Sequence, residues 1–173
     1  WNPEFEYVKY GQTVKVIKHI EKNYKDVPLI VAGDFNSMPW SNVMRYIYKL
    51  KPTINSNTKG EYNMNKKYME KFFDEEKNST NLRSAYDVYR TALTGQISKN
   101  KIDSKNVDDI KFNEFADNHP HFTVLTEEFC GCLDYIFYND DKLTVTELLE
   151  IPNSVEITNL KLPNYKYPSD HMK

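Results

Sequence analysis

The stretch Pro28-Leu29-Ile30-Val31-Ala32-Gly33-Asp34-Phe35-Asn36 decides the fold class of this 173-residue sequence. It is a short apolar run that ends in Gly and Asp, and such a run predicts a β-strand buried on both faces of a sheet. Helical patterns flank it, over residues 6–24 before the strand and residues 39–50 after it. The order helix, strand, helix indicates an α/β protein.

The two flanking helices are indicated by apolar side chains at helical spacing. These positions are Tyr7, Tyr10, Val14 and Ile17 in the first helix, and Val43, Met44, Ile47 and Leu50 in the second. Ser41 is the expected N-cap of the second helix, because its hydroxyl can accept a hydrogen bond from a free backbone N–H.

The last third of the chain is expected to form strands, at residues 121–126, 132–138 and 143–148. Residues 51–81 and 95–118 are polar and are expected to be insertions, the first with a short helix within 64–76. Together these elements predict an α/β sandwich built around a mixed sheet.

The composition limits the possible functions. Hydrophobic residues make up 39% and charged residues 28% with a net charge of −2, which indicates a globular chain without an overall attraction for nucleic acid. It has no run of 18 apolar residues that could span a membrane. Cys130 and Cys132 are expected to be buried free thiols, ill placed for a disulfide and too few for a zinc site. Free thiols are typical of a reducing compartment, so we expect an intracellular protein, cytoplasmic or mitochondrial. Because the sequence starts with Trp1, we expect it to be a piece of a longer protein.

Asp34 and Asn36 lie two positions apart at the C-terminal end of the predicted strand, so their side chains should point to the same side. Ligands of α/β folds bind at strand C-termini. A carboxylate there can take a proton from water or hold a metal ion, and an amide can donate to a phosphate oxygen. Gly, Asp and Asn are also common turn formers, so these residues alone fit a plain turn equally well.

Asp134 lies within the apolar run 132–138, where a carboxylate needs a partner. A histidine or a metal ion is the simplest partner, and a structural hydrogen bond is the alternative. Asp170 and His171 are adjacent and should face opposite ways on an extended segment, so each serves a different partner. One can ligate a metal ion while the other meets Asp134, and an Asp–His pair fixes the imidazole tautomer. With Asp34 and Asn36, this set suits phosphodiester hydrolysis with a hard cation.

Three motifs in this order resemble the endonuclease/exonuclease/phosphatase family: Gly33-Asp34-Phe35-Asn36-Ser37, Leu133-Asp134-Tyr135-Ile136 and Ser169-Asp170-His171. Residues 33–39, 84–86 and 122–123 also resemble its deadenylase-like branch. Within that branch, residues 129–137 and 167–171 look most like the 2′-phosphodiesterases, followed by the carbon-catabolite-repressor-type deadenylases. The similarity runs from residue 1 to residue 173 outside the two polar insertions. It implies a DNase I-like α/β sandwich, of which residues 1–173 form the C-terminal part of a single domain.

The resemblance also implies a role for each site residue. Asp34 would orient or deprotonate the attacking water or assist a metal ion, and Asn36 would hold the scissile phosphate. Asp170 would join the metal site. His171, oriented by Asp134, would contact the phosphate and stabilise charge in the transition state.

Some positions bear on the substrate. Phe129 matches a position at which the deadenylases stack an adenine, and a place in the core is its alternative role. Val124 stands where deadenylases often have Asn, so no hydrogen bond can read a base edge there. The family's metal-binding Glu, an early Asn and a His would all precede Trp1.

The sequence therefore predicts a phosphodiesterase or exoribonuclease that uses Mg²⁺ or Mn²⁺ and acts on poly(A) or 2′,5′-oligoadenylate RNA ends, with no membrane partner. A phosphomonoesterase acting on inositol or other small phosphates is one alternative. A non-catalytic member that binds nucleic acid is the other. Because the metal-binding Glu is not in the chain, we expect these 173 residues alone to be inactive.

Overall fold

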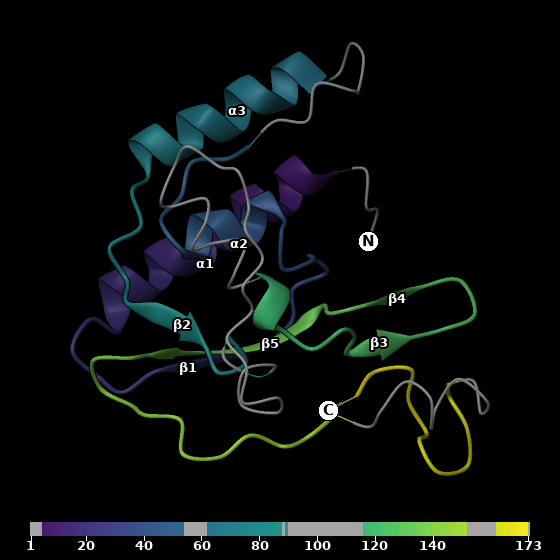
Figure 1. Cartoon of the computed structure of the whole chain (residues 1–173). Coiled ribbons are helices and arrows are strands. Elements are labelled where there is room, and N and C mark those ends of the chain that lie inside the picture. The colour runs from purple at the N-terminus through teal and green to yellow at the C-terminus, as the bar shows by residue number, and fades with distance from the viewer. Residues whose placement is uncertain (1–4, 54–61, 88, 90–115, 152–161, 173) are drawn as a thin grey trace.

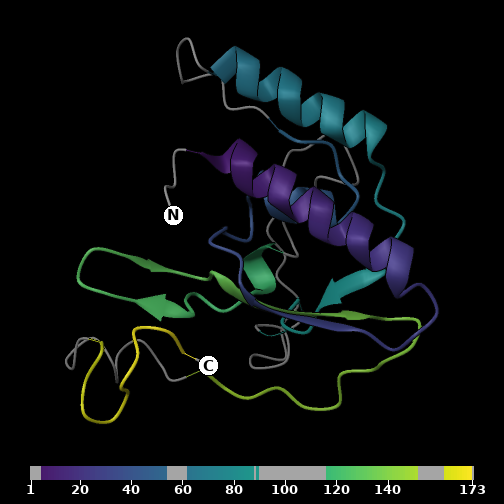
Figure 2. The same cartoon turned by 180° about the vertical axis from the view of Figure 1, so that it is seen from behind.

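Three helices lie on one side of a small β-sheet in the computed structural model, which describes residues 5–53, 62–87, 89, 116–151 and 162–172 (Figures 1 and 2). The elements in chain order are α1 (Glu6–Asn23), β1 (Ile30–Asp34), α2 (Asn42–Ile47), α3 (Tyr62–Glu75), β2 (Leu82–Ser84), β3 (Val124–Leu125), β4 (Cys130–Gly131) and β5 (Asp134–Asn139). The protein is therefore a mixed α/β structure, which confirms the predicted class.

The helices form where apolar side chains recur at helical spacing. On α1 the buried apolar residues are Tyr10, Val14, Ile17 and Ile20, which lie three or four positions apart. Ser41 caps α2 as predicted, since its side chain accepts a hydrogen bond from the Met44 N–H at 3.4 Å. All six residues of α2 are buried rather than one stripe of them. The helix predicted within residues 64–76 is present as α3.

The larger sheet has the strand order β1-β5-β2, and both outer strands run antiparallel to β5. A second, two-stranded sheet pairs β3 with β4, also antiparallel. The predicted mixed sheet is therefore wrong for the strands that the structure describes. After β1 the chain passes through α2 and α3 and returns on the far side of β5, so both neighbours of β5 run against it.

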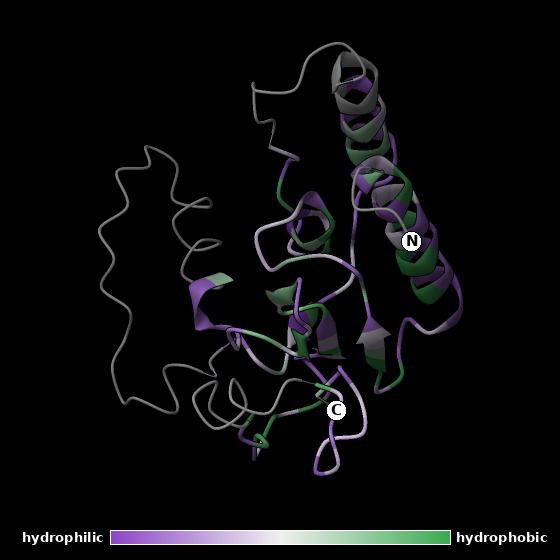
Figure 3. Ribbon diagram, turned by 90° about the vertical axis from the view of Figure 1, so that its right-hand side faces the viewer, coloured by the Kyte–Doolittle hydropathy of each residue, from purple (hydrophilic) through white to green (hydrophobic). Residues whose placement is uncertain are grey.

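In the described part of the chain, helices cover one face of the larger sheet. Tyr135 and Phe137 of β5 are buried and pack in one cluster with residues of α1 and α2. The alternate residues belong to the opposite face, where Ile136 of β5 is 41% exposed and Ile30 of β1 is 63% exposed. The prediction that β1 is buried on both faces is thus wrong, because the described helices all lie on one side of the sheet (Figure 3). We call the uncovered side the open face; it carries Ile30, Ala32, Asp34, Asp134, Ile136 and Tyr138.

The predicted strands of the last third are only partly present. The strand predicted at 132–138 is observed as β5, which begins at Asp134 and ends at Asn139. Of the strand predicted at 121–126, only the two residues of β3 are observed as a strand. Residues 143–148 form no strand, because no described strand lies beside them to supply hydrogen bonds. Most of the predicted loop 95–118 and the start at Trp1 lie outside the described residues.

Both thiols are free, but only Cys132 is buried, whereas Cys130 is exposed, so the expectation of two buried thiols is half right. Among the described residues, no helix is long and apolar enough to cross a membrane.

Candidate active site

Asp34 and Asn36 form a compact turn at the C-terminal end of β1. The Asp34 carboxylate accepts two hydrogen bonds from Asn36, one from its backbone N–H at 2.7 Å and one from its side-chain amide at 3.0 Å. Asn36 has a φ of 47°, in the left-handed region that asparagine tolerates better than most residues. The motif is therefore a turn, and the turn holds the two predicted site residues together at the strand end.

Asp134 is brought beside this turn by the sheet. It is the first residue of β5, and its Cα partner across the ladder is Asp34 of β1. Directly opposed residues of antiparallel strands project to the same face, with Cβ atoms about 4.5–5.5 Å apart. Two carboxylates from distant parts of the chain thus share one end of the open face.

His171 is the partner that Asp134 was predicted to need. Its Nδ1 lies 2.9 Å from Asp134 Oδ2 and 3.1 Å from Oδ1. Because a carboxylate only accepts, Nδ1 carries the hydrogen in this contact, and Nε2 is the ring nitrogen left for other chemistry. The prediction that one member of the Asp170-His171 pair meets Asp134 is confirmed.

The backbone beside β3 fixes the position of His171. An isolated antiparallel bridge joins His171 to Val124, and the Leu125 N–H donates to the Asp170 carbonyl at 3.0 Å. The Met172 N–H donates to the Thr123 carbonyl at 2.6 Å. This segment therefore lies alongside β3 like a short extra strand, which carries the imidazole to Asp134.

Thr123 completes the support of Asp134. Its hydroxyl accepts the backbone N–H groups of Leu133 at 3.0 Å and Asp134 at 2.9 Å. Both lone pairs are then used, and the hydroxyl hydrogen is donated to Asp134 Oδ2 at 2.8 Å. The sequence marked Phe122-Thr123 as a motif but gave this hydroxyl no role.

Asp170 has no such network within the described part of the chain. Its carbonyl accepts the Leu125 N–H of β3, and its side chain makes no hydrogen bond to the described residues. No group of three or more His, Cys, Asp or Glu side chains able to hold a metal ion occurs among the described residues. Asp34 and Asp170 are oxygen donors of the kind that Mg²⁺ prefers, but they do not make a complete site within the described part of the chain.

Phe129 lies in the loop that joins β3 to β4 and is only partly buried. The Thr126 side chain holds this loop, accepting the Phe129 N–H at 3.0 Å. A Cβ placed on Gly131 would come within 2.8 Å of Phe129 Cζ and 2.7 Å of Met38 Sδ. Because Gly131 has no side chain, the Phe129 ring and the Met38 side chain can both lie close to its backbone. Met38 follows the Asp34–Asn36 turn.

Two further polar features were missed. Lys9 of α1 donates from Nζ to the Asn36 carbonyl at 2.6 Å. Burial lowers the pKa of Lys9, and the charges of Glu6 and Asp34 oppose this shift. His119 is buried with Nε2 at 2.9 Å from the Ser84 hydroxyl. Neither contact leaves a local sequence signal, because the partners are 27 and 35 positions apart.

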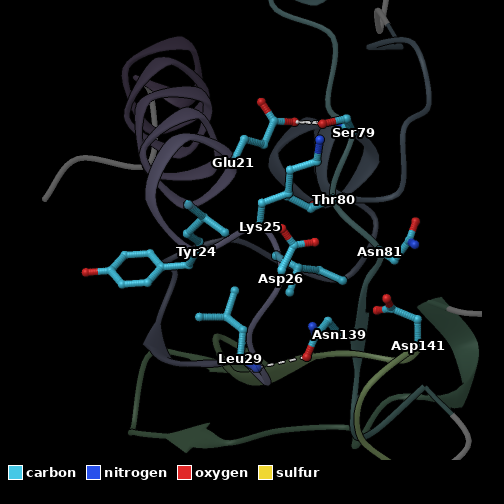
Figure 4. Close-up of a pocket in the computed structure, with 12 residues that line it drawn as sticks. Glu21, Tyr24, Lys25, Asp26, Leu29, Ser79, Thr80, Asn81, Asn139 and Asp141 are labelled. Carbon is cyan, nitrogen blue, oxygen red and sulfur yellow. Dashed lines mark hydrogen bonds between the residues drawn. The ribbon is translucent and has the colours of Figure 1, made fainter.

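A pocket of about 460 Å³ lies at the opposite end of the sheet (Figure 4). It is lined by residues that include Leu29, just before β1, and Asn139, the last residue of β5, whereas Asp34 and Asp134 stand at the other end of the same strand pair. None of the predicted site residues lines it, so this pocket is separate from the cluster of Asp34, Asn36, Asp134 and His171.

The sequence matches the model of the endonuclease/exonuclease/phosphatase family over residues 20–171. The chain belongs to this family. Members of the family are phosphodiester hydrolases, and many depend on a metal ion. The match includes every predicted site residue, from Asp34 to His171.

Several similar proteins are named as exoribonucleases or phosphodiesterases. "Probable CCR4-Not complex 3'-5'-exoribonuclease subunit Ccr4" of Enterocytozoon bieneusi is 29% identical over 99% of this chain and 29% of its own length. Carbon catabolite repressor protein 4 homolog 1 of Arabidopsis thaliana is 29% identical over 98% of this chain and 27% of its own length. 2',5'-Phosphodiesterase 12 of Homo sapiens is 25% identical over 99% of this chain and 23% of its own length. The chain thus spans less than a third of the length of these relatives.

Proposed function

We propose that the full-length protein hydrolyses phosphodiester bonds at the ends of poly(A) or 2′,5′-oligoadenylate, and that this chain supplies Asp34, Asn36, Asp134 and His171. The observation that carries the proposal is the Asp134–His171 pair at 2.9 Å, standing across the ladder from Asp34. An oriented imidazole beside a second carboxylate and an amide provides the donors and acceptors that hydrolysis of a phosphodiester needs.

In this proposal the Asp34 carboxylate orients the attacking water and accepts its proton. The side-chain amide of Asn36 has two hydrogens, of which one is donated to Asp34, and the other is offered to an oxygen of the scissile phosphate. His171 Nε2 faces the phosphate while Nδ1 stays on Asp134. The water oxygen bonds to phosphorus, and the bond from phosphorus to the leaving nucleoside oxygen breaks. The leaving oxygen takes a proton from solvent, and charge on the phosphate oxygens is met by these fixed donors.

A divalent cation fits the donor set only in part. Asp34 and Asp170 would hold Mg²⁺ or Mn²⁺ together with at least one further ligand from outside the described residues. When bound, such an ion would supply positive charge that neutralises the phosphate oxygens. A metal-binding Glu in the part of the protein that precedes this chain remains the predicted additional ligand.

The open face supports the finer fold proposal, a DNase I-like sandwich of which residues 1–173 are the C-terminal part of one domain. Exposed Ile30 and Ile136 lie side by side with Ala32 on this face, and burying them against a second sheet would remove apolar area from water. The site residues Asp34 and Asp134 lie at one end of the same face. We therefore expect the isolated 173-residue chain to be inactive.

The test is an assay of the full-length protein against 2′,5′- and 3′,5′-linked oligoadenylate, poly(A) and inositol phosphates, with and without Mg²⁺. We expect cation-dependent release of nucleotides from an adenylate substrate. Asp34→Ala and His171→Ala should each abolish this release while the thermal unfolding curve stays cooperative. Activity confined to inositol phosphates, or full activity in either variant, would refute the proposal.

A further inference from the structure

Lys9, in the first turn of α1, contacts the backbone of the Asp34–Asn36 turn. Its Nζ donates to the Asn36 carbonyl at 2.6 Å, and the side chain is partly buried on the way. The helix that carries it is held firmly, because the next residue, Tyr10, is fully buried in the core. A charged group on a packed helix thus has a fixed contact with a residue of the proposed active site.

Asn36 needs such support because of its conformation. Its φ of 47° lies in a region that non-glycine residues occupy only when the surroundings favour it, although asparagine does so more readily than most. Its N–H and its side-chain amide both point at Asp34, so its carbonyl is turned the other way, toward Lys9. Holding the carbonyl therefore fixes the rotation of the residue and the direction of its side chain.

The same face of α1 also holds the other end of this loop. Glu6, one helical turn before Lys9, accepts the backbone N–H of Asn42 at 2.7 Å. Between the two ends, the Tyr135 hydroxyl donates to the Ser37 carbonyl at 2.7 Å. The segment from Asn36 to Asn42 is thus attached to α1 at both ends and to β5 in the middle, and Lys9 makes the attachment at the site.

We propose that Lys9 is a positioning residue for the reaction: by bonding the Asn36 carbonyl, it holds the Asn36 amide at Asp34 and toward the phosphate. This inference rests on the function proposed above. It gives α1 a role in the reaction in addition to its packing against the core.

The experiment uses the full-length protein with Lys9→Met, which keeps an unbranched apolar side chain and removes the donor. Lys9→Arg keeps a donor, and Lys15→Met makes the same chemical change at an exposed position of α1. With 2′,5′- and 3′,5′-oligoadenylate, we expect Lys9→Met to lower kcat by about 10- to 100-fold with little change in KM, since small misplacements of a catalytic group have effects of that size. Lys15→Met should leave kcat unchanged, and Lys9→Arg should recover part of the loss.

A second readout does not depend on turnover. In protein labelled with ¹⁵N-asparagine, the Asn36 side-chain amide signal, assigned by its absence in Asn36→Asp, should shift in Lys9→Met and stay in place in Lys15→Met. If wild-type protein does not cleave oligoadenylate, the proposed function fails while this signal still tests Lys9. The inference about Lys9 alone is overturned if the Asn36 signal does not move in Lys9→Met. It is also overturned if the wild type is active and Lys9→Met has the same kcat.

Discussion

The carboxylates of Asp34 and Asp134 are neighbours because the two residues are Cα partners across the β1–β5 ladder. Their remaining contacts differ. Asp34 is bonded to Asn36 of its own turn, whereas Asp134 is bonded to His171 and Thr123 from other segments. The two acids therefore have different surroundings in one place: Asp34 is exposed, and Asp134 holds an imidazole.

Replacing Asp134 by Asn tests this division. Thr123 and His171 both donate to Oδ2, and an asparagine oxygen in that place could still accept both hydrogen bonds. The amide nitrogen, however, cannot accept the second contact of His171 Nδ1, at 3.1 Å, and the negative charge that orients the imidazole is lost. We expect kcat to fall by about 10²- to 10⁴-fold, the range associated with a misplaced acid or base. Steady-state kinetics of the full-length protein measures it. Asp26→Asn, which neutralises an exposed carboxylate in the α1–β1 connection, is the matched control, and an equal loss there would contradict the expectation.

Thr123→Val should unfold more easily than the wild type. The substitution keeps the shape of the side chain but leaves the backbone N–H groups of Leu133 and Asp134 without their acceptor. Thr123 is only 5% exposed, so water replaces these contacts poorly. With about 1–3 kcal/mol for each of the two buried donors left unpaired, we expect the free energy of unfolding to drop by about 2–6 kcal/mol.

Urea denaturation gives this free energy, and Thr123→Ser is the control because it keeps the hydroxyl. The serine variant should stay within about 1 kcal/mol of the wild type, since it loses one partly packed methyl group. Equal stability of the valine and serine variants would show that the hydroxyl does not support the two N–H groups.

Gly131→Ala should weaken substrate binding without unfolding the chain. The added methyl group would lie 2.7 Å from Met38 Sδ and 2.8 Å from Phe129 Cζ, which are the ends of side chains that can move aside. If a base stacks on Phe129, a displaced ring should raise KM for oligoadenylate about fivefold or more, because stacking on an aromatic ring is worth about 1–3 kcal/mol per base. Thermal unfolding should change little.

The double variant Gly131→Ala/Met38→Ala is the check on this mechanism. Removing the Met38 side chain gives the new methyl group room, so the two changes together should affect KM less than their summed single effects. Simple additivity would mean that Met38 and Gly131 do not act on Phe129 through one contact.

Cys132 should resist alkylation, and its buried thiol should lower the stability of the folded state at alkaline pH. Burial raises the pKa of the Cys132 thiol to about 12, so the folded state keeps a proton that the unfolded state loses near pH 9. Because the folded state binds more protons in this window, its stability falls as pH rises from 9 toward 12. At pH 10.5 we expect about 2 kcal/mol less stabilisation relative to Cys132→Ala than at pH 8.

Urea curves of the two proteins at both pH values measure this difference. In parallel, iodoacetamide at pH 8 should modify Cys130, which is exposed, and leave Cys132 unmodified until urea is added. Rapid labelling of Cys132 in the native protein would contradict the burial of its thiol.

The contact between Asp134 and His171 was easier to predict from the sequence than the sheet that carries Asp134. It was predicted because a carboxylate in an apolar run needs a partner and because an adjacent Asp and His cannot pair with each other. Those arguments use only the chemistry of the side chains and the alternation of a strand. They also gave the correct partner of Asp134.

Features that depend on distant packing could not be predicted in the same way. The apolar pattern of β1 indicates burial on two faces, but nothing within it tells which elements cover each face, and the described helices cover one. Residues 143–148 alternate as a strand should, yet pairing also needs a neighbour. Lys9 was overlooked because a lysine on a helix is normally solvated, and its contact with Asn36 joins positions 27 apart.

The register of β1 against β5 has a consequence for how this gene can change. Asp134 and Phe137 are three positions apart on β5 and therefore lie on opposite surfaces. Inserting or deleting a single residue between them would bring both to the same surface, so that either Asp134 would turn away from Asp34 or Phe137 would leave the interior. A length mutation at this place therefore removes either the alignment of the two acids or part of the core.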